Sequence, residues 1–227
     1  MSLAISTYQQ LQNECLARGV TLVAVSKTKP VNAILQLYEL GHRDFGENYV
    51  QELVDKQGQL PTDIRWHFIG HLQSNKVKAI APFIHLIQSA DSLKLLKEIN
   101  KEAGKCGRVI SVLIQVHVAQ EDTKFGWAPG DLPELWKELS SLSLPYIRLA
   151  GIMGMATFTE NVQQLRSEFQ QLKQAHGQLA DFLRAHPEWD TVQPLILSMG
   201  MSGDYTLAIE EGSTLVRIGS LLFGARS

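Results

Sequence analysis

Short apolar runs alternate with amphipathic segments along most of this chain. Each run is rich in aliphatic and aromatic side chains and is bounded by polar residues or glycine, a pattern typical of buried strands. The runs predict strands at residues 21–25, 42–45, 65–69, 83–88, 109–118, 148–152, 195–198 and 215–218.

The segments between these runs predict helices. Pro30 opens one and Gly41 ends it, because proline suits a first helical turn and glycine a helix end. Ser74 is expected to cap a second helix, and Asp91 or Ser92 a third, since these side chains accept from free backbone N–H groups. The predicted helices cover residues 3–18, 30–40, 48–57, 74–81, 92–103, 131–142, 160–184 and 202–211.

This alternation predicts an α/β fold of parallel strands joined by crossover helices. Within 227 residues it fits a closed (β/α)₈ TIM barrel, which takes about 250 residues. We expect a single domain over residues 1–227, with an extra helix at the amino terminus. The alternative is an open, doubly wound sheet, but no GxGxxG or Walker-type loop follows the first strand.

Composition narrows the class of protein. The chain is 44% hydrophobic and carries 21 basic and 23 acidic residues, so a nucleic-acid binder is not expected. Cys15 and Cys106 lie far apart, which argues against a disulfide framework or a cysteine zinc site. No secretion signal and no stretch of ~20 apolar residues is present. We therefore expect a soluble cytoplasmic protein that contacts no membrane.

A barrel places its functional side chains where strands end. Lys27 follows the first predicted strand. A lysine amine in a partly dry pocket loses its proton more readily and becomes a nucleophile towards aldehydes. Lys27 is therefore a candidate for a Schiff base with a carbonyl cofactor. The alternative is a lysine whose stem covers apolar surface while its ammonium group reaches water.

The loops after the last two strands are rich in small residues and hydroxyl groups. Residues 198–203 lead into a helix, whose free N–H groups would favour an anion. Gly219 and Ser220 follow the neighbouring strand and could add a backbone N–H and a hydroxyl. The two loops predict a phosphate site, although Ser202 could simply cap the helix.

Arg217 lies within the apolar strand at 215–218, where a buried charge needs an acceptor. A cofactor ring nitrogen or a carboxylate would serve. The alternative is an ion pair with Glu210 or Glu211. A lysine that can form an imine, a phosphate site and an arginine for a ring nitrogen are together what pyridoxal 5′-phosphate (PLP) requires.

Other polar residues carry weaker signals. His67 and His71 are four residues apart, but they lie on a strand and the following loop and have no third ligand, so a metal site is not expected. The charged residues at 121–124 are expected in a solvated loop.

Several segments resemble one family of PLP-binding proteins. They read VAVSKTKP, FGENYVQE, WHFIGHLQSNK, LIQSADS, GIMGMATF, LSMGMSGDYTLAIEEGST and VRIGSLLFGAR, and they span residues 23–226. The chain is thereby similar to the pyridoxal-phosphate homeostasis proteins, single-domain relatives of the alanine racemase barrel with fold type III. Two departures are His71, where the family usually has proline, and Ser220, where it usually has threonine.

This resemblance implies a role for each candidate residue. It places the cofactor as an aldimine on Lys27, the ring near Asn48 and the pyridine nitrogen against Arg217. It assigns the phosphate to Ser202, Gly219 and Ser220, with Ser198 and Met199 lining the pocket.

The resemblance also bears on catalysis. A guanidinium cannot accept a proton, so the pyridine nitrogen beside Arg217 stays unprotonated and the ring is a poorer electron sink. The related racemases carry a second, β-rich domain with a tyrosine base, whereas this chain ends at Ser227. We therefore expect a cytoplasmic, monomeric carrier that delivers PLP to apo-enzymes by exchange between amines, and not an enzyme. The alternatives are an amino-acid racemase of low activity and a barrel that binds another phosphorylated metabolite.

Overall fold

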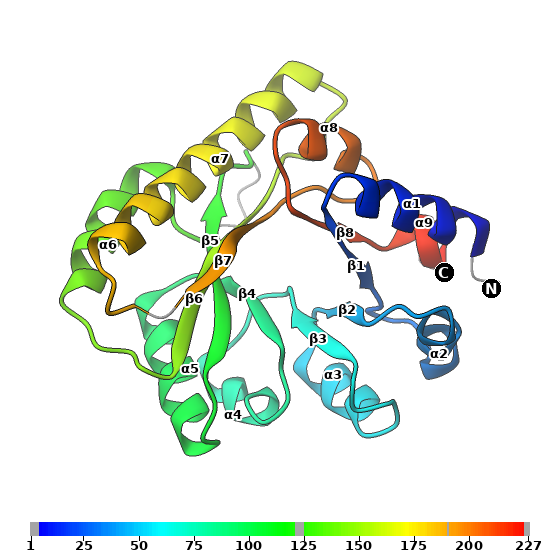
Figure 1. Cartoon of the computed structure of the whole chain (residues 1–227), viewed down its shortest axis with the longest axis horizontal. Coiled ribbons are helices and arrows are strands. Elements are labelled where there is room, and N and C mark those ends of the chain that lie inside the picture. The colour runs from blue at the N-terminus through cyan, green and yellow to red at the C-terminus, as the bar shows by residue number, and fades with distance from the viewer. Residues whose placement is uncertain (1–4, 121–124, 190, 225–227) are drawn as a thin grey trace.

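A computed structural model describes residues 5–120, 125–189 and 191–224. Over these residues, parallel strands form a closed barrel in the order β1 to β8 (Figure 1). The predicted TIM barrel is confirmed, and the open sheet is wrong because β8 pairs with β1. The strands are β1 (Thr21–Val25), β2 (Asp44–Glu47), β3 (Arg65–Phe68), β4 (Leu86–Ala90), β5 (Ile110–His117), β6 (Ile147–Met155), β7 (Thr191–Ser198) and β8 (Leu215–Ile218).

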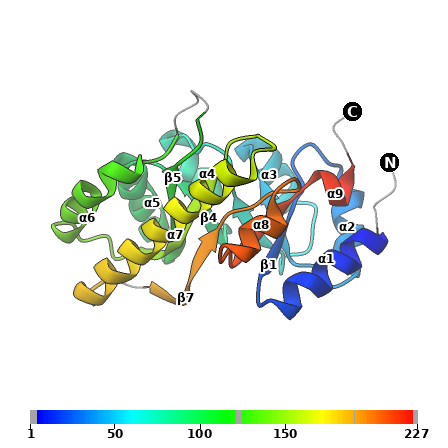
Figure 2. The same ribbon diagram turned by 90° about the horizontal axis from the view of Figure 1, so that it is seen from above.

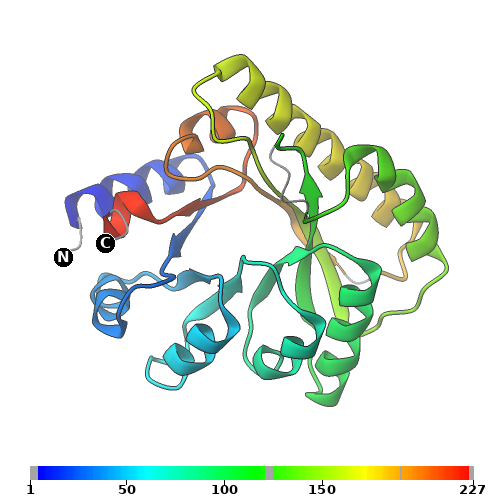
Figure 3. The same cartoon turned by 180° about the vertical axis from the view of Figure 1, so that it is seen from behind.

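Helices surround the strands on the outside of the barrel (Figures 1 and 3). The extra first helix, α1, packs beside the last one, α9, so the two ends of the described chain lie near each other (Figure 2). The α-helices are α1 (Ile5–Ala17), α2 (Val31–Glu39), α3 (Val50–Gln57), α4 (Val77–Ile80), α5 (Leu93–Lys105), α6 (Leu132–Ser140), α7 (Val162–Ala185), α8 (Tyr205–Glu210) and α9 (Ser220–Phe223), with 3₁₀ turns η1 (Ser74–Lys76) and η2 (Pro129–Asp131).

Some predicted boundaries are wrong. The strand expected from residue 83 begins only at Leu86, because Phe83 and Ile84 close the turn after α4 with N–H bonds to the Ile80 carbonyl. Ser74 is not a cap, since Gln73 occupies that position and no side chain accepts there. Ser92 is a cap, and its hydroxyl accepts from the Leu95 N–H at 3.3 Å. The segment at 121–124 lies outside the described residues.

Two hydrophobic clusters form the core. The larger one lies between the strands and the surrounding helices. The smaller one contains Val23 of β1, Leu86 of β4 and Leu215 of β8, together with Leu113, Ala150 and Met153. These side chains fill part of the barrel interior, as branched residues do in such barrels. Buried polar side chains also lie on the barrel strands, among them Gln88 of β4 and Arg217 of β8.

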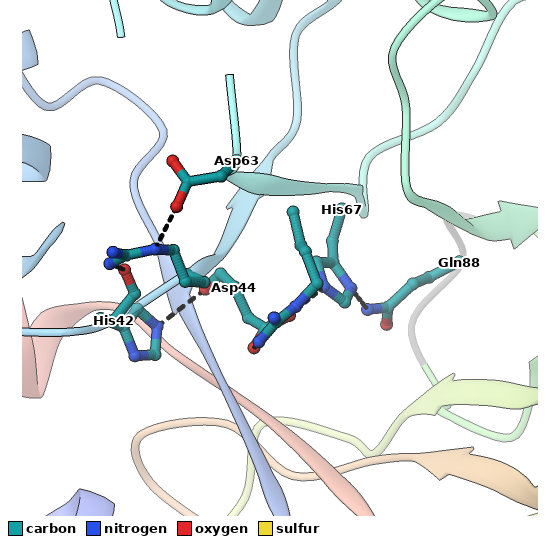
Figure 4. Close-up of polar contacts among 7 residues, drawn as sticks. His42, Asp44, Asp63, His67 and Gln88 are labelled. Carbon is teal, nitrogen blue, oxygen red and sulfur yellow. Dashed lines mark hydrogen bonds and ion pairs between the residues drawn. The ribbon is translucent and has the colours of Figure 1, made fainter. Parts of the chain in front are cut away.

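His42 gives the fold a testable response to acid. It is buried, and its Nε2 donates to the Asp44 carbonyl at 2.8 Å (Figure 4). Burial lowers the pKa of His42 despite this bond. Below about pH 6.5 the unfolded chain therefore binds a proton more readily than the folded one, so stability is lost as the pH falls towards the folded-state pKa. We expect the fall in urea midpoint between about pH 7.5 and 5 to be smaller in His42→Gln than in the wild type.

The glutamine amide can still donate to the Asp44 carbonyl but does not titrate. His186→Gln is the matched control, because His186 is only partly buried and bonds the exposed Glu188. Equal acid responses in the wild type and His42→Gln would show that His42 does not carry this effect.

Candidate functional site

A cavity of about 840 Å³ opens where the barrel strands end. Its wall is built from the segments after β1, β2 and β3, the end of β6 with the start of α7, and the segments after β7 and β8. The sequence predicts functional side chains at these positions. Six of the eight candidate residues line the cavity: Lys27, Asn48, Ser202, Arg217, Gly219 and Ser220.

Lys27 lies in a tight turn directly after β1. The Ser26 N–H donates to the Gly46 carbonyl at 2.9 Å, and the Lys29 N–H donates back to the Ser26 carbonyl at 3.0 Å. Thr28 has φ of 62°, an uncommon value for a β-branched residue, and its N–H donates to Glu52 Oε1 at 2.6 Å. These bonds hold the half-buried Lys27 in the cavity wall.

A buried ionic cluster supports this turn from below. Lys56 Nζ donates to the Ser26 carbonyl, to Glu47 Oε1 and to Glu52 Oε1, each at 2.7 Å. The Ser26 hydroxyl also donates to Glu47 Oε1, at 2.6 Å. Glu47 is fully buried, and burial raises the pKa of its carboxyl while Lys56 opposes that effect. Sequence reasoning missed this cluster, although the Glu52–Lys56 spacing is that of a helical ion pair.

Lys29 also lines the cavity, but its amine donates hydrogen bonds to backbone carbonyls at the end of α9. Its Nζ donates to the carbonyls of Phe223 and Gly224 at 3.1 and 3.4 Å. The α9 helix itself was not predicted from the sequence. Lys29 therefore connects the turn after β1 with the segment that follows β8.

The two loops of the predicted phosphate site lie side by side. The Gly219 N–H donates to the Ser202 hydroxyl at 3.3 Å. Ser202 is not a helix cap, because α8 begins at Tyr205 and Asp204 occupies the N-cap position. Gly200 has φ of 94°, and a Cβ there would come within 2.6 Å of the Ala208 Cβ. The loop after β7 therefore requires glycine at this position.

Arg217 reaches the cavity from the barrel interior. Its Nη1 donates to the Ser198 hydroxyl at 2.5 Å and its Nη2 to the Gly154 carbonyl at 2.9 Å. Burial lowers the pKa of Arg217 to about 10, although the negative charge of Asp204 acts to raise it. The guanidinium is therefore positive at neutral pH. The alternative pairing of Arg217 is wrong, since Glu210 and Glu211 both bind Arg166.

Two candidates lie elsewhere than predicted. Neither Ser198 nor Met199 is part of the cavity wall, and both are fully buried. Ser198 lies behind Arg217 and bonds it, while Met199 packs in the outer core. The sixth strand, predicted at 148–152, extends to Met155, so Met153 lies inside β6 and not after it.

Asn48 follows β2 and contributes an amide to the wall. Its Oδ1 is buried and has no hydrogen-bond partner among the described residues. An unsatisfied buried polar group costs about 1–3 kcal/mol, so a polar ligand here would stabilise the site. An amine, an amide, a guanidinium and a hydroxyl beside a backbone loop suit a ligand with a carbonyl, a ring nitrogen and a phosphate.

His71 lies outside the cavity wall. Its Nδ1 is 2.9 Å from Asp91 Oδ2, and its ring stacks on Phe125 with centroids 3.9 Å apart. Within the described ranges, no group of three or more His, Cys, Asp or Glu side chains could hold a metal ion. No helix in the same ranges is long and apolar enough to cross a membrane.

Comparisons with known proteins identify the family of this chain. Residues 5–227 match the family described as alanine racemase, N-terminal domain. A pyridoxal phosphate homeostasis protein of Aquifex aeolicus is 40% identical over 224 residues, which cover 96% of this chain and 94% of the relative. Another from Escherichia coli is 40% identical over 212 residues, or 91% of this chain and 86% of the relative.

Solved structures extend the comparison to the fold. PipY of Synechococcus elongatus, solved with PLP bound, has a TM-score of 0.82 and 34% identity, covering 96% of this chain and 99% of PipY. An alanine racemase of Clostridium difficile has a TM-score of 0.71 and 15% identity, covering 99% of this chain and 57% of the racemase, and shows the fold alone. The resemblance seen in the sequence motifs is confirmed, and the chain belongs to the family of pyridoxal phosphate homeostasis proteins.

Proposed function

We propose that this chain binds PLP in the cavity, with the cofactor aldehyde and the Lys27 amine joined as an imine and one water released. The proposal rests mainly on one observation: Lys27, Arg217 and the hydrogen-bonded Ser202–Gly219 pair all line the same cavity. The PLP-bound PipY structure, at 34% identity over nearly the whole chain, supports the same ligand.

The wall offers a partner for each polar group of the cofactor. Arg217 would donate to the ring nitrogen, and Asn48 would face the ring with its unsatisfied amide. Ser202, Gly219 and Ser220 would hold the phosphate. When bound, PLP supplies an electron sink to attached amines. Arg217 weakens that sink, because a guanidinium has no proton acceptor and leaves the ring nitrogen unprotonated.

We propose further that the protein stores and delivers PLP instead of turning over a substrate. An unprotonated ring nitrogen beside Arg217 would disfavour turnover, because racemisation needs the ring to accept the electrons of the substrate carbanion. The rim is open, with Phe158 at 98% exposure, which suits entry of an acceptor amine. We propose that the chain acts in the cytoplasm as a one-domain monomer that meets PLP-dependent apo-enzymes transiently.

Transfer and turnover can be separated in one experiment. The PLP-loaded protein is mixed with an apo-aminotransferase, and the return of aminotransferase activity is followed. In parallel, chiral chromatography measures racemisation of a panel of single-enantiomer amino acids. We expect aminotransferase activity to return. We also expect the amount of each amino acid that is racemised to stay below one equivalent relative to the protein. Many turnovers on any amino acid would support the racemase and contradict the carrier.

A further inference from the structure

Five polar side chains form a continuous line through the barrel interior. Arg217 Nη1 bonds Ser198 Oγ at 2.5 Å, and Ser198 Oγ bonds Gln88 Oε1 at 2.7 Å. Gln88 Nε2 lies 3.0 Å from His67 Nδ1, and His67 Nε2 lies 3.0 Å from Asp44 Oδ1. Figure 4 shows the part of this line at Asp44, His67 and Gln88. We call these five residues, from Arg217 to Asp44, the interior line.

The donor and acceptor groups of these side chains allow hydrogen bonds to be donated in only one direction along the interior line, from Arg217 towards Asp44. A guanidinium can only donate, so the Ser198 hydroxyl accepts from Arg217 and turns its own proton to Gln88 Oε1. The amide NH₂ of Gln88 then faces His67. His67 must accept at Nδ1 and carry its proton on Nε2, which donates to the Asp44 carboxylate.

The far end of the interior line is fixed by Arg65. It binds Asp44 with two nitrogens, at 2.7 and 2.5 Å, and its side chain is 49% exposed at the start of β3. Burial raises the pKa of the Asp44 carboxyl, but the bonds from Arg65 and His67 outweigh burial and hold the pKa well below its usual range. Asp44 therefore stays an acceptor, which keeps every bond above it in one orientation.

A purely structural role explains this arrangement poorly. Barrel interiors are usually packed with branched apolar side chains, and hydrogen-bonded polar groups there are often replaceable by apolar ones without loss of stability. Here His67, Gln88 and Ser198 are all buried at 2% exposure or less. They lead to Arg217, which is the member that lines the cavity.

We propose that Gln88 and His67 are positioning residues that fix the Arg217 guanidinium towards the ring nitrogen of the cofactor. Asp44 selects the His67 tautomer that makes this possible. The inference rests on the proposed function, since it takes PLP as the ligand that Arg217 meets. It assigns a task to three side chains that do not touch the cavity.

Nitrogen NMR tests the interior line without relying on the cofactor. In the cofactor-free protein labelled with ¹⁵N-arginine, we expect distinct, slowly rotating Nη groups for Arg217, assigned with Arg217→Lys. Gln88→Leu should average these signals. Gln115→Leu should leave them distinct, because Gln115 is equally a buried barrel glutamine but bonds the Phe125 carbonyl instead. Averaging in neither variant, or in both, would overturn the proposal.

A second measurement covers the case in which Gln88→Leu fails to fold. The ¹⁵N-histidine spectrum of the wild type should show His67 as the neutral Nε2–H tautomer, and an Nδ1–H tautomer would overturn the proposal.

With ¹⁵N-labelled PLP added, Gln88→Leu should shift the ring-nitrogen signal and weaken PLP affinity about tenfold, the loss expected for one charged hydrogen bond. If the wild type binds no PLP, the proposed function fails, while the arginine and histidine signals still decide the role of the interior line.

Discussion

Replacing Lys27 with alanine is expected to abolish covalent PLP binding. The variant should lose the visible absorbance band of the imine and release the cofactor on gel filtration. Ring, phosphate and amide contacts remain, but without the amine they hold PLP only through non-covalent interactions. Lys27 is half-buried in the wall of the cavity, so the truncation to alanine should leave the fold intact.

Lys29→Ala is the matched control. Lys29 is two residues away and lines the same cavity, yet its amine donates to the Phe223 and Gly224 carbonyls. We expect this variant to keep the absorbance band. If Lys29→Ala loses the band and Lys27→Ala keeps it, the imine is formed by Lys29, and our assignment to Lys27 is wrong.

Replacing Lys56 with methionine is expected to destabilise the protein by about 3–5 kcal/mol, the cost of breaking a buried ion pair. The total free energy of unfolding of most domains is only about 5–15 kcal/mol. The variant leaves the Glu47 carboxylate, at 0% exposure, without its counter-charge. Because burial raises the pKa of Glu47, the loss should grow as the pH rises through the folded-state pKa, where the carboxyl must ionise.

Urea unfolding of two further variants checks this cause. Lys101→Met removes a lysine that also binds two glutamates, Glu98 and Glu102, but whose side chain is 56% exposed; such pairs contribute at most about 1 kcal/mol. The double variant Glu47→Gln with Lys56→Met should recover much of the lost stability. Equal losses for Lys56→Met and Lys101→Met would contradict the role given to burial.

The strands could be predicted where apolar runs are short and clearly bounded. The bounds of β1 and β8 match their predicted ranges, 21–25 and 215–218. The start of β4 could not be predicted, because Phe83 and Ile84 continue the apolar run while forming a turn. Hydrophobicity alone does not distinguish such a turn from a strand.

The cavity residues were predictable because they follow strands in a barrel, where all strand ends meet. The interior line was not, since its contacts join residues as distant as Gln88 and Ser198 and depend on strand register. A signal was nevertheless present. His67 and Gln88 are polar residues within predicted strands, and in a parallel barrel buried on both faces such residues need partners.

Reduction of the PLP-loaded wild type with borohydride tests the central claim most directly. Borohydride converts an imine to a stable amine, and peptide mass mapping then locates the attached cofactor. We predict attachment at Lys27 alone. Attachment at another lysine, or recovery of all PLP unattached, would contradict the proposal that the Lys27 amine binds the cofactor.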